Sequence, residues 1–465
     1  MTNKGIIFFA VIIFAIKIAS IFFTSFNLFG DEAQYWLWSK SLDFGYFSKP
    51  PFLAWFIKLH TVLFGENFVS LKLIPSLVYF LTAFALYNLC KNIGLNKNDS
   101  FVCSLIFLFI PAVSFSSFFL STDLFLLLFW TLSLNELIKI KKSPDTNKFV
   151  VLGLMLGLAF LSKYAAIYFL LCLFLVLFLD KNFRFVISKN YFGLLMCIVC
   201  CFVVILPNLY WNLNNGWVTI QHTSDNANFN NIKINIFRGL SFLLTQIIMI
   251  GPLLFVGNVI NYKRINLDSD KKFLLFFSIP IFLIVFIEAV IVRANANWAA
   301  PALISFYLFL YVNIVSIKSI YLKLNIYFNF AICIIFFILI GLSYPISVFE
   351  RISGIKEFAN SVKVYGDNKK ITDYVVSDRM LFASLSYELK NYNLVLHMPH
   401  EKNDIVTNHF KISSPLKKEM SRNFILIGNI NDIDYLENNF TCNEKGFELT
   451  NVHYQHFVPV KICFN

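Results

Sequence analysis

The chain has 465 residues, of which 58% are hydrophobic and only 14% charged, and 56 are phenylalanine. Soluble domains run nearer to half apolar and a quarter charged, so this composition excludes an ordinary water-soluble protein and indicates an integral membrane protein in contact with membrane lipids. The net charge of +12 does not indicate a nucleic-acid partner, because the basic residues form short clusters between apolar runs.

Long apolar runs recur from the N-terminus to about residue 345. Because a helix needs about 20 apolar residues to cross a bilayer, we predict about eleven transmembrane helices. The predicted spans are 5–28, 67–90, 101–118, 120–138, 149–161, 164–179, 191–210, 237–260, 273–292, 299–316 and 325–345. The first run has no small-residue cleavage site after a short apolar core, so we expect a membrane helix rather than a signal peptide.

Lysine and arginine are unevenly distributed between alternate loops. Lys4 and one set of loops carry about 16 basic residues, whereas the other set carries about six. The richer set is expected to be cytoplasmic, and the N-terminus with it. The segments that then face outward are 29–66, 119–123, 162–163, 211–236, 293–298 and everything after residue 346.

The segment 346–465 is polar and alternates β-rich runs with helix-like runs. The predicted strands and helices are Ile371–Val376, Met380–Lys390, Phe424–Gly428 and Asp432–Asn438. The predicted fold is therefore an α-helical polytopic membrane domain, residues 1–345, followed by a small periplasmic α/β domain, residues 346–465.

Two of the nine cysteines, Cys442 and Cys463, lie in this polar segment. In an oxidising compartment they could pair as a disulfide, and a pair of free thiols is the alternative. The other seven lie in apolar stretches and are expected to be small core residues.

The first outer loop, 29–66, begins with two adjacent carboxylates, Asp31 and Glu32. An aromatic segment follows, and its tryptophans suit a membrane-interface belt. Such a belt does not explain adjacent carboxylates where lipid and anionic headgroups meet, so both are candidate catalytic residues.

Asp123, Lys163 and Arg293 are ionisable residues beside long apolar runs on the same predicted face. Such groups are costly near hydrocarbon and are usually functional or paired. The alternatives are a helix N-cap for Asp123 and snorkelling for the two cations. Together with Lys49 the cations could bind an anion, while the deeper Glu288 is expected to pair with Arg293.

Five motifs in chain order resemble those of the C-type membrane glycosyltransferases, in the branch of the protein O-mannosyltransferases and the aminoarabinose lipid A transferases. The motifs are the string from Asp31 to Trp55, Thr122-Asp123, Leu161-Ser162-Lys163-Tyr164, Leu206–Asn212 with Asn215-Gly216-Trp217, and Asn297-Trp298-Ala299-Ala300-Pro301. The resemblance covers most of residues 1–310.

The resemblance implies an undecaprenyl-phosphate sugar as donor, transfer on the periplasmic face of a bacterial inner membrane, and inversion at the anomeric carbon. The implied acceptor is lipid A or lipopolysaccharide, another envelope glycan, or protein. By the same resemblance Asp31 serves the acceptor, Lys49 and Tyr46 lie near the lipid phosphate, and Asn297 and Trp298 are candidate substrate-binding residues.

The chain departs from the family pattern at two positions of the first motif. Ser48 stands where the family has Glu before the lysine, and Gln34 stands where it has Arg three residues after the first Asp. These departures leave the exact donor and acceptor open.

The residues support this chemistry independently of the resemblance. An inverting transfer needs a base for the acceptor and cations that stabilise the departing phosphate. Asp31 is the predicted base, and Lys49, Lys163 and Arg293 are the predicted cations. Asp123 is expected to orient the acceptor or Asp31.

The sequence supports no particular cofactor, although Asp31, Glu32 and Asp123 could hold Mg²⁺ or Mn²⁺. The paired histidines in His397-x-x-His400 and His453-x-x-His456 have no obvious thiol or carboxylate partners, so we expect ordinary surface residues and no metal site.

Two other functions fit parts of the sequence. An envelope oligosaccharide polymerase or ligase would share the outer-face chemistry and differ in the size of the donor. A membrane transporter would be expected to carry midplane charges, broken helices and inverted repeats, and the sequence shows the charges at one face and no repeat.

Overall fold

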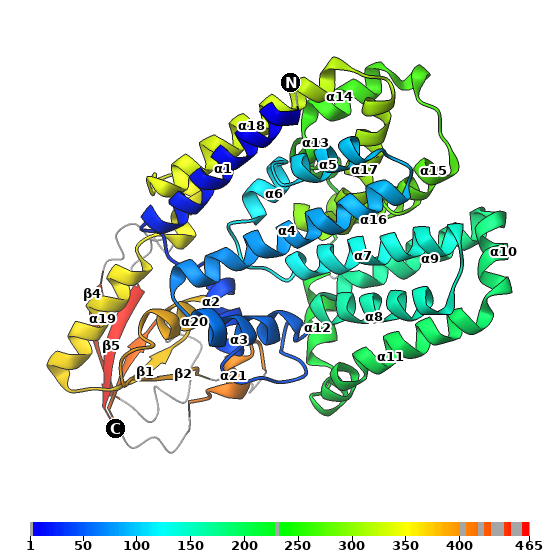
Figure 1. Ribbon diagram of the computed structural model, residues 1–465. Helices are drawn as coiled ribbons and strands as arrows, with labels where there is room; N and C mark the ends of the chain where they lie inside the picture. Colours follow the sequence, from blue (N-terminus) through cyan, green and yellow to red (C-terminus); the bar gives the residue numbers. More distant parts are fainter. Residues whose placement is uncertain are drawn as a thin grey trace. The chain divides into compact units, whose positions relative to one another are not determined.

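The computed structural model describes residues 3–227, 232–399, 406–416, 423–428, 441–447 and 458–464. This part of the chain is mostly helical, with one small sheet (Figure 1). The chain divides into two compact units. Unit 1 consists of Met1–Ile21, Lys49–Leu53 and Leu71–Leu339, and unit 2 of Phe22–Ser48, Ala54–Ser70 and Ile340–Asn465. Most of the first outer loop therefore belongs with the C-terminal region and not with the helices of unit 1.

Unit 1 is entirely helical in its described residues. Its α-helices are α1 (Asn3–Phe23), α4 (Phe68–Asn92), α5 (Lys97–Phe107), α6 (Pro111–Ser116), α7 (Asp123–Lys142), α8 (Thr146–Ser162), α9 (Ile167–Leu179), α10 (Lys181–Lys189), α11 (Tyr191–Asn214), α12 (Val218–Ala227), α13 (Ile236–Ile250), α14 (Pro252–Ile260), α15 (Ser269–Phe276), α16 (Ile279–Ile291), α17 (Ala300–Ser316) and α18 (Ile320–Gly341). Short 3₁₀ turns join some of them, namely η1 (Tyr164–Ala166), η2 (Tyr262–Arg264) and η3 (Ala296–Ala299).

Six described helices are long and apolar enough to cross a membrane, and up to eight spans result if each of two bent helix pairs counts as one. The bent pairs are α9 with α10, at 106°, and α13 with α14, at 99°. This is fewer than the eleven predicted spans for identifiable reasons. The predicted span 101–118 is broken into α5 and α6, α7 has charged residues in its last turn, and α8 is short.

Two glycines on α8 allow α11 to approach closely. A Cβ at Gly153 would lie 2.3 Å from the backbone oxygen of Cys197, and a Cβ at Gly157 would lie 2.7 Å from Cβ of Val204. Small residues four apart on one helix face are typical of close packing in membranes, where van der Waals contact drives association. The contact fixes the C-terminal end of α8, where Lys163 follows.

Unit 2 contains the sheet and most of its covering helices. Its helices are α2 (Gly30–Trp38), α3 (Phe52–Phe64, which begins in unit 1), η4 (Ser347–Ile352), α19 (Ile355–Lys369), α20 (Arg379–Glu388) and α21 (Phe410–Ser413). Its strands are β1 (Asp373–Val376), β2 (Val395–His397), β3 (Phe424–Ile427), β4 (Thr441–Phe447) and β5 (Val458–Phe464).

The five strands are arranged in the order β2-β1-β3-β5-β4. The pairs of β1 with β2 and with β3 are parallel, and those of β5 with β3 and with β4 are antiparallel. The strands predicted at 371–376 and 424–428 and the helix predicted at 380–390 correspond to β1, β3 and α20. The helix predicted over Asp432–Asn438 lies outside the described residues.

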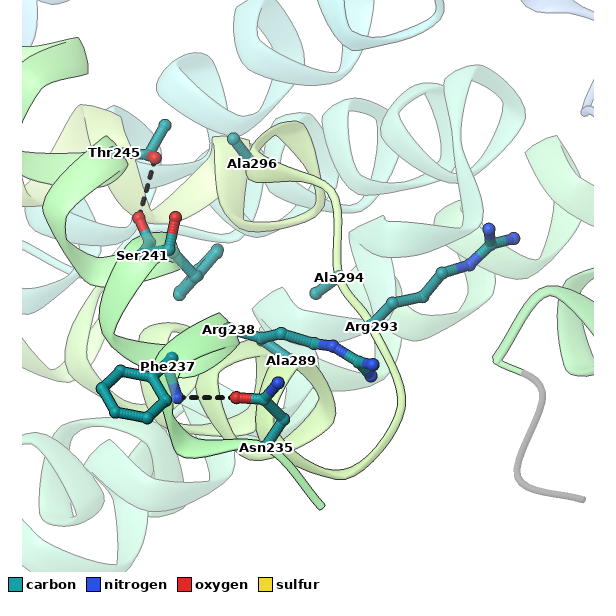
Figure 2. A pocket seen from close by; sticks show the side chains of 10 residues that line it. Asn235, Phe237, Arg238, Ser241, Thr245, Ala289, Arg293, Ala294 and Ala296 are labelled. Carbon is teal, nitrogen blue, oxygen red and sulfur yellow. Dashed lines mark hydrogen bonds between the residues drawn. The ribbon is translucent and has the colours of Figure 1, made fainter. Parts of the chain in front are cut away.

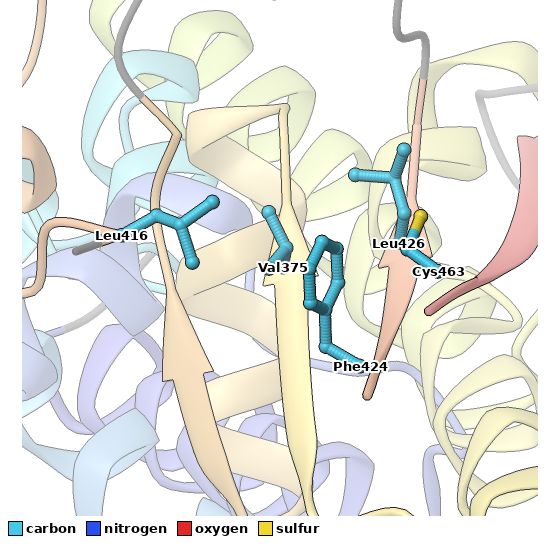
Figure 3. Close-up of a cluster of buried hydrophobic side chains, with 5 residues drawn as sticks. All are labelled: Val375, Leu416, Phe424, Leu426 and Cys463. Carbon is cyan, nitrogen blue, oxygen red and sulfur yellow. The ribbon is translucent and has the colours of Figure 1, made fainter. Parts of the chain in front are cut away.

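The centre of the sheet is buried and largely apolar. β1 and β3 are buried along their whole length, as expected for inner strands covered on both faces. Figure 3 shows the buried cluster on one side of the sheet, formed by Val375, Leu416, Phe424, Leu426 and Cys463.

Cys463 also forms a disulfide with Cys442, and the two residues face each other directly on β5 and β4. Of the two alternatives for these cysteines, the structure shows the disulfide.

Helix α2 of the outer loop packs against α20 of the C-terminal region (Figure 1). The approach is close, because a Cβ at Gly30 would lie 2.9 Å from Cβ of Met380. Further along, the rings of Trp36 and Tyr387 meet edge to face at 5.0 Å. Asn27 joins the two regions again, donating its N–H to the carbonyl of Ile352 at 2.6 Å. Unit 2 is thus built from both regions.

We expect the disulfide to contribute measurably to the stability of unit 2. It closes a loop across a sequence separation of 21 residues, which corresponds to about 3 kcal/mol in the chain-entropy model. Cys442→Ser should therefore lower the thermal unfolding temperature of the purified chain, as reported by aromatic fluorescence. Cys200→Ser, at a free and partly buried thiol of α11, is the matched control and should change it little. An equal effect of the two substitutions would contradict the prediction.

Candidate functional site

An almost buried ion pair joins two of the predicted site residues in unit 1. Nζ of Lys163 lies 2.6 Å from Oδ1 of Asp123, and the two side chains are only 16% and 11% exposed. The second oxygen of this carboxylate accepts a hydrogen bond from Nδ2 of Asn297 at 3.1 Å. We call these three residues the polar triad. The sequence placed them on one face, and the structure brings them into contact.

Each member of the polar triad lies where a helix begins or ends. Asp123 is the first residue of α7, Lys163 is extended between α8 and η1, and Asn297 lies in η3. A carboxylate in the first turn of a helix interacts favourably with the helix dipole. The extended backbone at Lys163 turns the chain from α8 toward α9, as the sequence predicted for a hairpin tip.

A second set of hydrogen bonds continues from Lys163 to the fourth motif. The hydroxyl of Tyr164 donates to Oδ1 of Asn208 at 2.8 Å and accepts from Nδ2 of Asn212 at 3.0 Å. Four of the five sequence motifs are therefore connected by side-chain hydrogen bonds in unit 1.

The opposite end of α7 carries a different ion pair. Lys141 lies 2.9 Å from Asp270 at the start of α15, and Lys142 lies 3.8 Å from the same carboxylate. These residues belong to the basic loops that the sequence assigned to the other face. These two basic loops thus lie at the C-terminal end of α7, and the polar triad lies at its N-terminal end.

In unit 2, Asp31 and Glu32 have different environments. Glu32 is buried, and its Oε2 accepts the backbone N–H of Phe29 at 2.8 Å, which caps the first turn of α2. Asp31 is half-buried, and no hydrogen bond or ion pair holds its carboxylate within the part of the chain that the structure describes. Of the two, only Asp31 is available to a substrate.

Tyr46 is fully buried within unit 2. Its hydroxyl donates to the carbonyl of Trp38 at 3.0 Å, and its ring stacks on that of Trp38 at 4.6 Å. Burial raises the pKa of Tyr46 to about 12. The imidazole of His409 meets both rings nearly perpendicularly, at 5.2 and 5.6 Å, and burial lowers the pKa of His409 to about 4 despite the charge of Asp43. His409 is therefore neutral at physiological pH.

A charged cluster covers the outer side of Trp36. Glu66 accepts a hydrogen bond from the indole of Trp36 at 3.2 Å and pairs with Lys40, and the ammonium of Lys40 lies 4.7 Å from the indole ring. Burial alone would raise the pKa of Glu66, but hydrogen bonds and charges from Lys40, Trp36 and Lys390 lower it overall. The cluster keeps a carboxylate ionised beside α2.

The remaining predicted cations have separate positions in unit 1. Lys49 lies half-buried before α3. Arg293 is exposed in the loop after α16 and lines a cavity of about 440 Å³ with Arg238, Asn235, Ser241 and Thr245 (Figure 2). Its neighbour Trp298 is half-buried in η3.

The predicted pair between Glu288 and Arg293 is wrong, since no ion pair joins them in the described segments. Glu288 lies on α16, whereas Arg293 lies in the loop beyond the end of this helix.

Three further cations, which the sequence did not single out, have defined positions in the structure. Arg379 of α20 donates from Nη1 to Oε1 of Gln34 at 3.1 Å. Arg238 shares the cavity with Arg293 and donates to the carbonyl of Val292. Lys72 of α4 is fully buried, with its ammonium 4.0 Å from the ring of Phe118. A single lysine inside an apolar run was the available signal for Lys72.

Among the described residues, no group of three or more His, Cys, Asp and Glu side chains is arranged as metal ligands. His397 forms a pair with Asp373 at 3.3 Å in the sheet. His400, His453 and His456 lie outside the described residues.

We expect the Asp123–Lys163 pair to be strongly coupled. Removing one partner of a pair this well buried leaves an uncompensated charge, which costs about 3–5 kcal/mol. Lys163→Met and Asp123→Asn should each lower the unfolding temperature, and the double variant should be more stable than the sum of the single effects predicts. Lys40 and Glu66, whose side chains are each 38% exposed, form the control pair and should couple by less than about 1 kcal/mol. Simple additivity at Asp123 and Lys163 would contradict this.

We expect His409 to make unit 2 sensitive to acid. A lowered pKa means that the unfolded chain binds the proton first, so stability falls as the pH drops through about 6.5 and reaches its lowest level near pH 4. The loss amounts to about 3 kcal/mol. Thermal unfolding between pH 8 and 4 should show a smaller decline for His409→Asn than for the wild type, and an unchanged decline for His397→Asn. Equal declines in all three proteins would show that His409 is not the source of the acid sensitivity.

Sequence relatives support the family resemblance. Residues 48–211 match the family described as dolichyl-phosphate-mannose-protein mannosyltransferase. The chain is 33% identical over 293 residues to the lipid A galacturonosyltransferase RgtD of Rhizobium johnstonii, over 62% of this chain and 61% of RgtD. The chain thus matches about three fifths of the length of this relative.

The fold is similar to that of ArnT from Cupriavidus metallidurans. The apo structure of ArnT gives a TM-score of 0.66 at 13% identity, over 98% of each chain. The structure bound to undecaprenyl phosphate gives 0.66 at 14% identity, over 99% of this chain and 98% of ArnT. The described helices that are long and apolar enough to cross a membrane indicate a membrane protein. The sequence and fold relationships support the resemblance that the motifs predicted: the chain is similar in sequence to the mannosyltransferase family over residues 48–211 and to a lipid A galacturonosyltransferase, and similar in fold to ArnT.

Proposed function

We propose that the chain is an inverting glycosyltransferase that moves a sugar from an undecaprenyl-phosphate donor to a lipid A acceptor. The observation that carries this is the 33% identity to a lipid A galacturonosyltransferase over a stretch of 293 residues. The likeness to ArnT bound to undecaprenyl phosphate supports the choice of donor lipid. Galacturonic acid is the first sugar to test, because RgtD carries it in its name.

Asp31 is assigned as the general base that receives the proton of the acceptor. Its carboxylate is half-buried at the start of α2 and has no partner in the described part of the chain, so it can bind a substrate hydroxyl. Glu32 caps α2, and Tyr46 orders the loop that leads to Lys49. Glu32 therefore positions Asp31, and Tyr46 positions Lys49.

Lys163 is assigned to the departing phosphate, together with Lys49 and Arg293. An ammonium carries three donors, and Lys163 gives one of them to Asp123. Asp123 and Asn297 therefore hold Lys163 in one orientation and leave further donors for a phosphate oxygen. In a site with little water such a fixed cation stabilises the developing charge strongly. Trp298 is assigned to contact with the lipid or sugar.

For the membrane topology we propose about eleven crossings, with the N-terminus cytoplasmic and the polar triad and the sheet periplasmic. The excess of lysine and arginine in alternate loops supports this orientation. On the same basis, residues 1–345 form the membrane domain and 346–465 a periplasmic α/β domain that works together with the outer loop, 29–66.

We expect Asp31→Asn to abolish most of the transfer of radiolabelled sugar from undecaprenyl phosphate to lipid A. Loss of a general base typically lowers the rate by about 10²–10⁴-fold. Glu32→Gln is the matched control, because the amide oxygen can still accept the N–H of Phe29, and it should keep activity within about tenfold of the wild type. The assay uses purified chain in lipid, with product resolved by chromatography.

Full activity of folded Asp31→Asn would rule out the base assignment. No transfer by the wild type from any undecaprenyl-phosphate sugar would rule out the proposed function itself. Parallel reactions with Mg²⁺, Mn²⁺ and EDTA show whether a divalent cation takes part, which the sequence left open.

A further inference from the structure

A guanidinium from the C-terminal region lies one helical turn from Asp31. Arg379 is the first residue of α20, and its Nη1 donates to Oε1 of Gln34 at 3.1 Å. Gln34 follows Asp31 by three residues on α2, and residues three apart lie on the same side of a helix. Arg379 and Asp31 are therefore neighbours on one surface of unit 2.

The charge of Arg379 is not compensated by a carboxylate. The side chain is half-buried, and within the described part of the chain no ion pair involves it. The adjacent Asp378 accepts the N–H of Leu381 at 2.7 Å, as an N-cap of α20. Gln34 is neutral and takes one of the five donors of the guanidinium. The remaining donors are available to an anion.

The packing of α2 on α20 holds Arg379 in place. The close approach at Gly30 and Met380 sets the distance between the two helices at this end. At the other end, the hydroxyl of Tyr387 donates to the carbonyl of Glu66 at 3.2 Å. A cation held in this way is preorganised, so a ligand gains its interaction without the cost of ordering the side chain.

We propose that Arg379 binds a phosphate oxyanion of the acceptor and so positions the acceptor at Asp31. A phosphorylated acceptor would be repelled by the carboxylate of Asp31 alone, and a guanidinium one turn away offsets this repulsion. Guanidinium also matches phosphate with two parallel hydrogen bonds. The identity of the acceptor rests on the proposed function. The anion-binding site rests on the position of Arg379 beside Gln34, which does not depend on that function.

The test measures binding of lipid A by the full-length chain in nanodiscs, using native mass spectrometry and no sugar donor. The probes are bis-phosphorylated lipid A, the same lipid after removal of its phosphates, and undecaprenyl phosphate. Arg379→Gln removes the charge and keeps a polar side chain. Gln34→Ala removes the hydrogen bond and keeps the guanidinium.

We expect Arg379→Gln to weaken binding of phosphorylated lipid A by about tenfold or more, as for loss of charge-assisted hydrogen bonds. Its preference for the phosphorylated over the dephosphorylated lipid should fall by the same factor, and binding of undecaprenyl phosphate should not change. Gln34→Ala should retain the preference. Unchanged unfolding temperatures establish that both variants are folded.

Three results would overturn the inference: an unchanged preference in Arg379→Gln, an equal loss in Gln34→Ala, or a loss confined to undecaprenyl phosphate. The last result would assign Arg379 to the donor phosphate. The binding test is independent of the transfer assay. A wild type that binds phosphorylated lipid A through Arg379 but transfers no sugar in the separate assay would therefore contradict only the proposed function.

Discussion

The buried pair of Asp123 and Lys163 is the interaction on which the candidate site of unit 1 depends. A charge at this depth is tolerated only with a partner, so the pair fixes the start of α7 against the end of α8. Asn297 adds η3 to the same point, and Tyr164 extends the network to α11. Segments up to 174 residues apart in sequence thus meet through side chains with little freedom to move.

In unit 2 the candidate site residues are held in place by the packing of two helices rather than by an ion pair. Gly30 lets α2 lie directly on α20, and the cap from Glu32 leaves Asp31 as the available acid at the start of the helix. In the proposed function the C-terminal region takes part in acceptor binding, because its helix α20 supplies Arg379. An enzyme that acts at a lipid surface benefits from such rigidity, since preorganised charges need no rearrangement during the reaction.

The sequence predicted the membrane class, the common face of the polar triad, two central strands and the helix at α20, because these follow from periodicity, loop charge and motif order. It did not predict that Asp123 and Lys163 pair, or that Glu32 caps α2. The role of a carboxylate depends on its neighbours in the fold, and the sequence does not show them. The position of Arg379 beside Gln34 could not be predicted for the same reason, because it depends on the tertiary packing of two helices about 345 residues apart. Six to eight of the eleven predicted spans correspond to described helices that are long and apolar enough to cross a membrane, because charged turns and breaks interrupt the others.

The most direct test of the central claim is mass spectrometry of lipid A and other envelope glycans from the native bacterium, with the gene deleted and then restored. The account predicts that deletion removes one glycosyl group from lipid A and that the wild-type gene restores it. Lipid A and envelope glycans that are identical in the two strains, under conditions in which the protein is made, would contradict it.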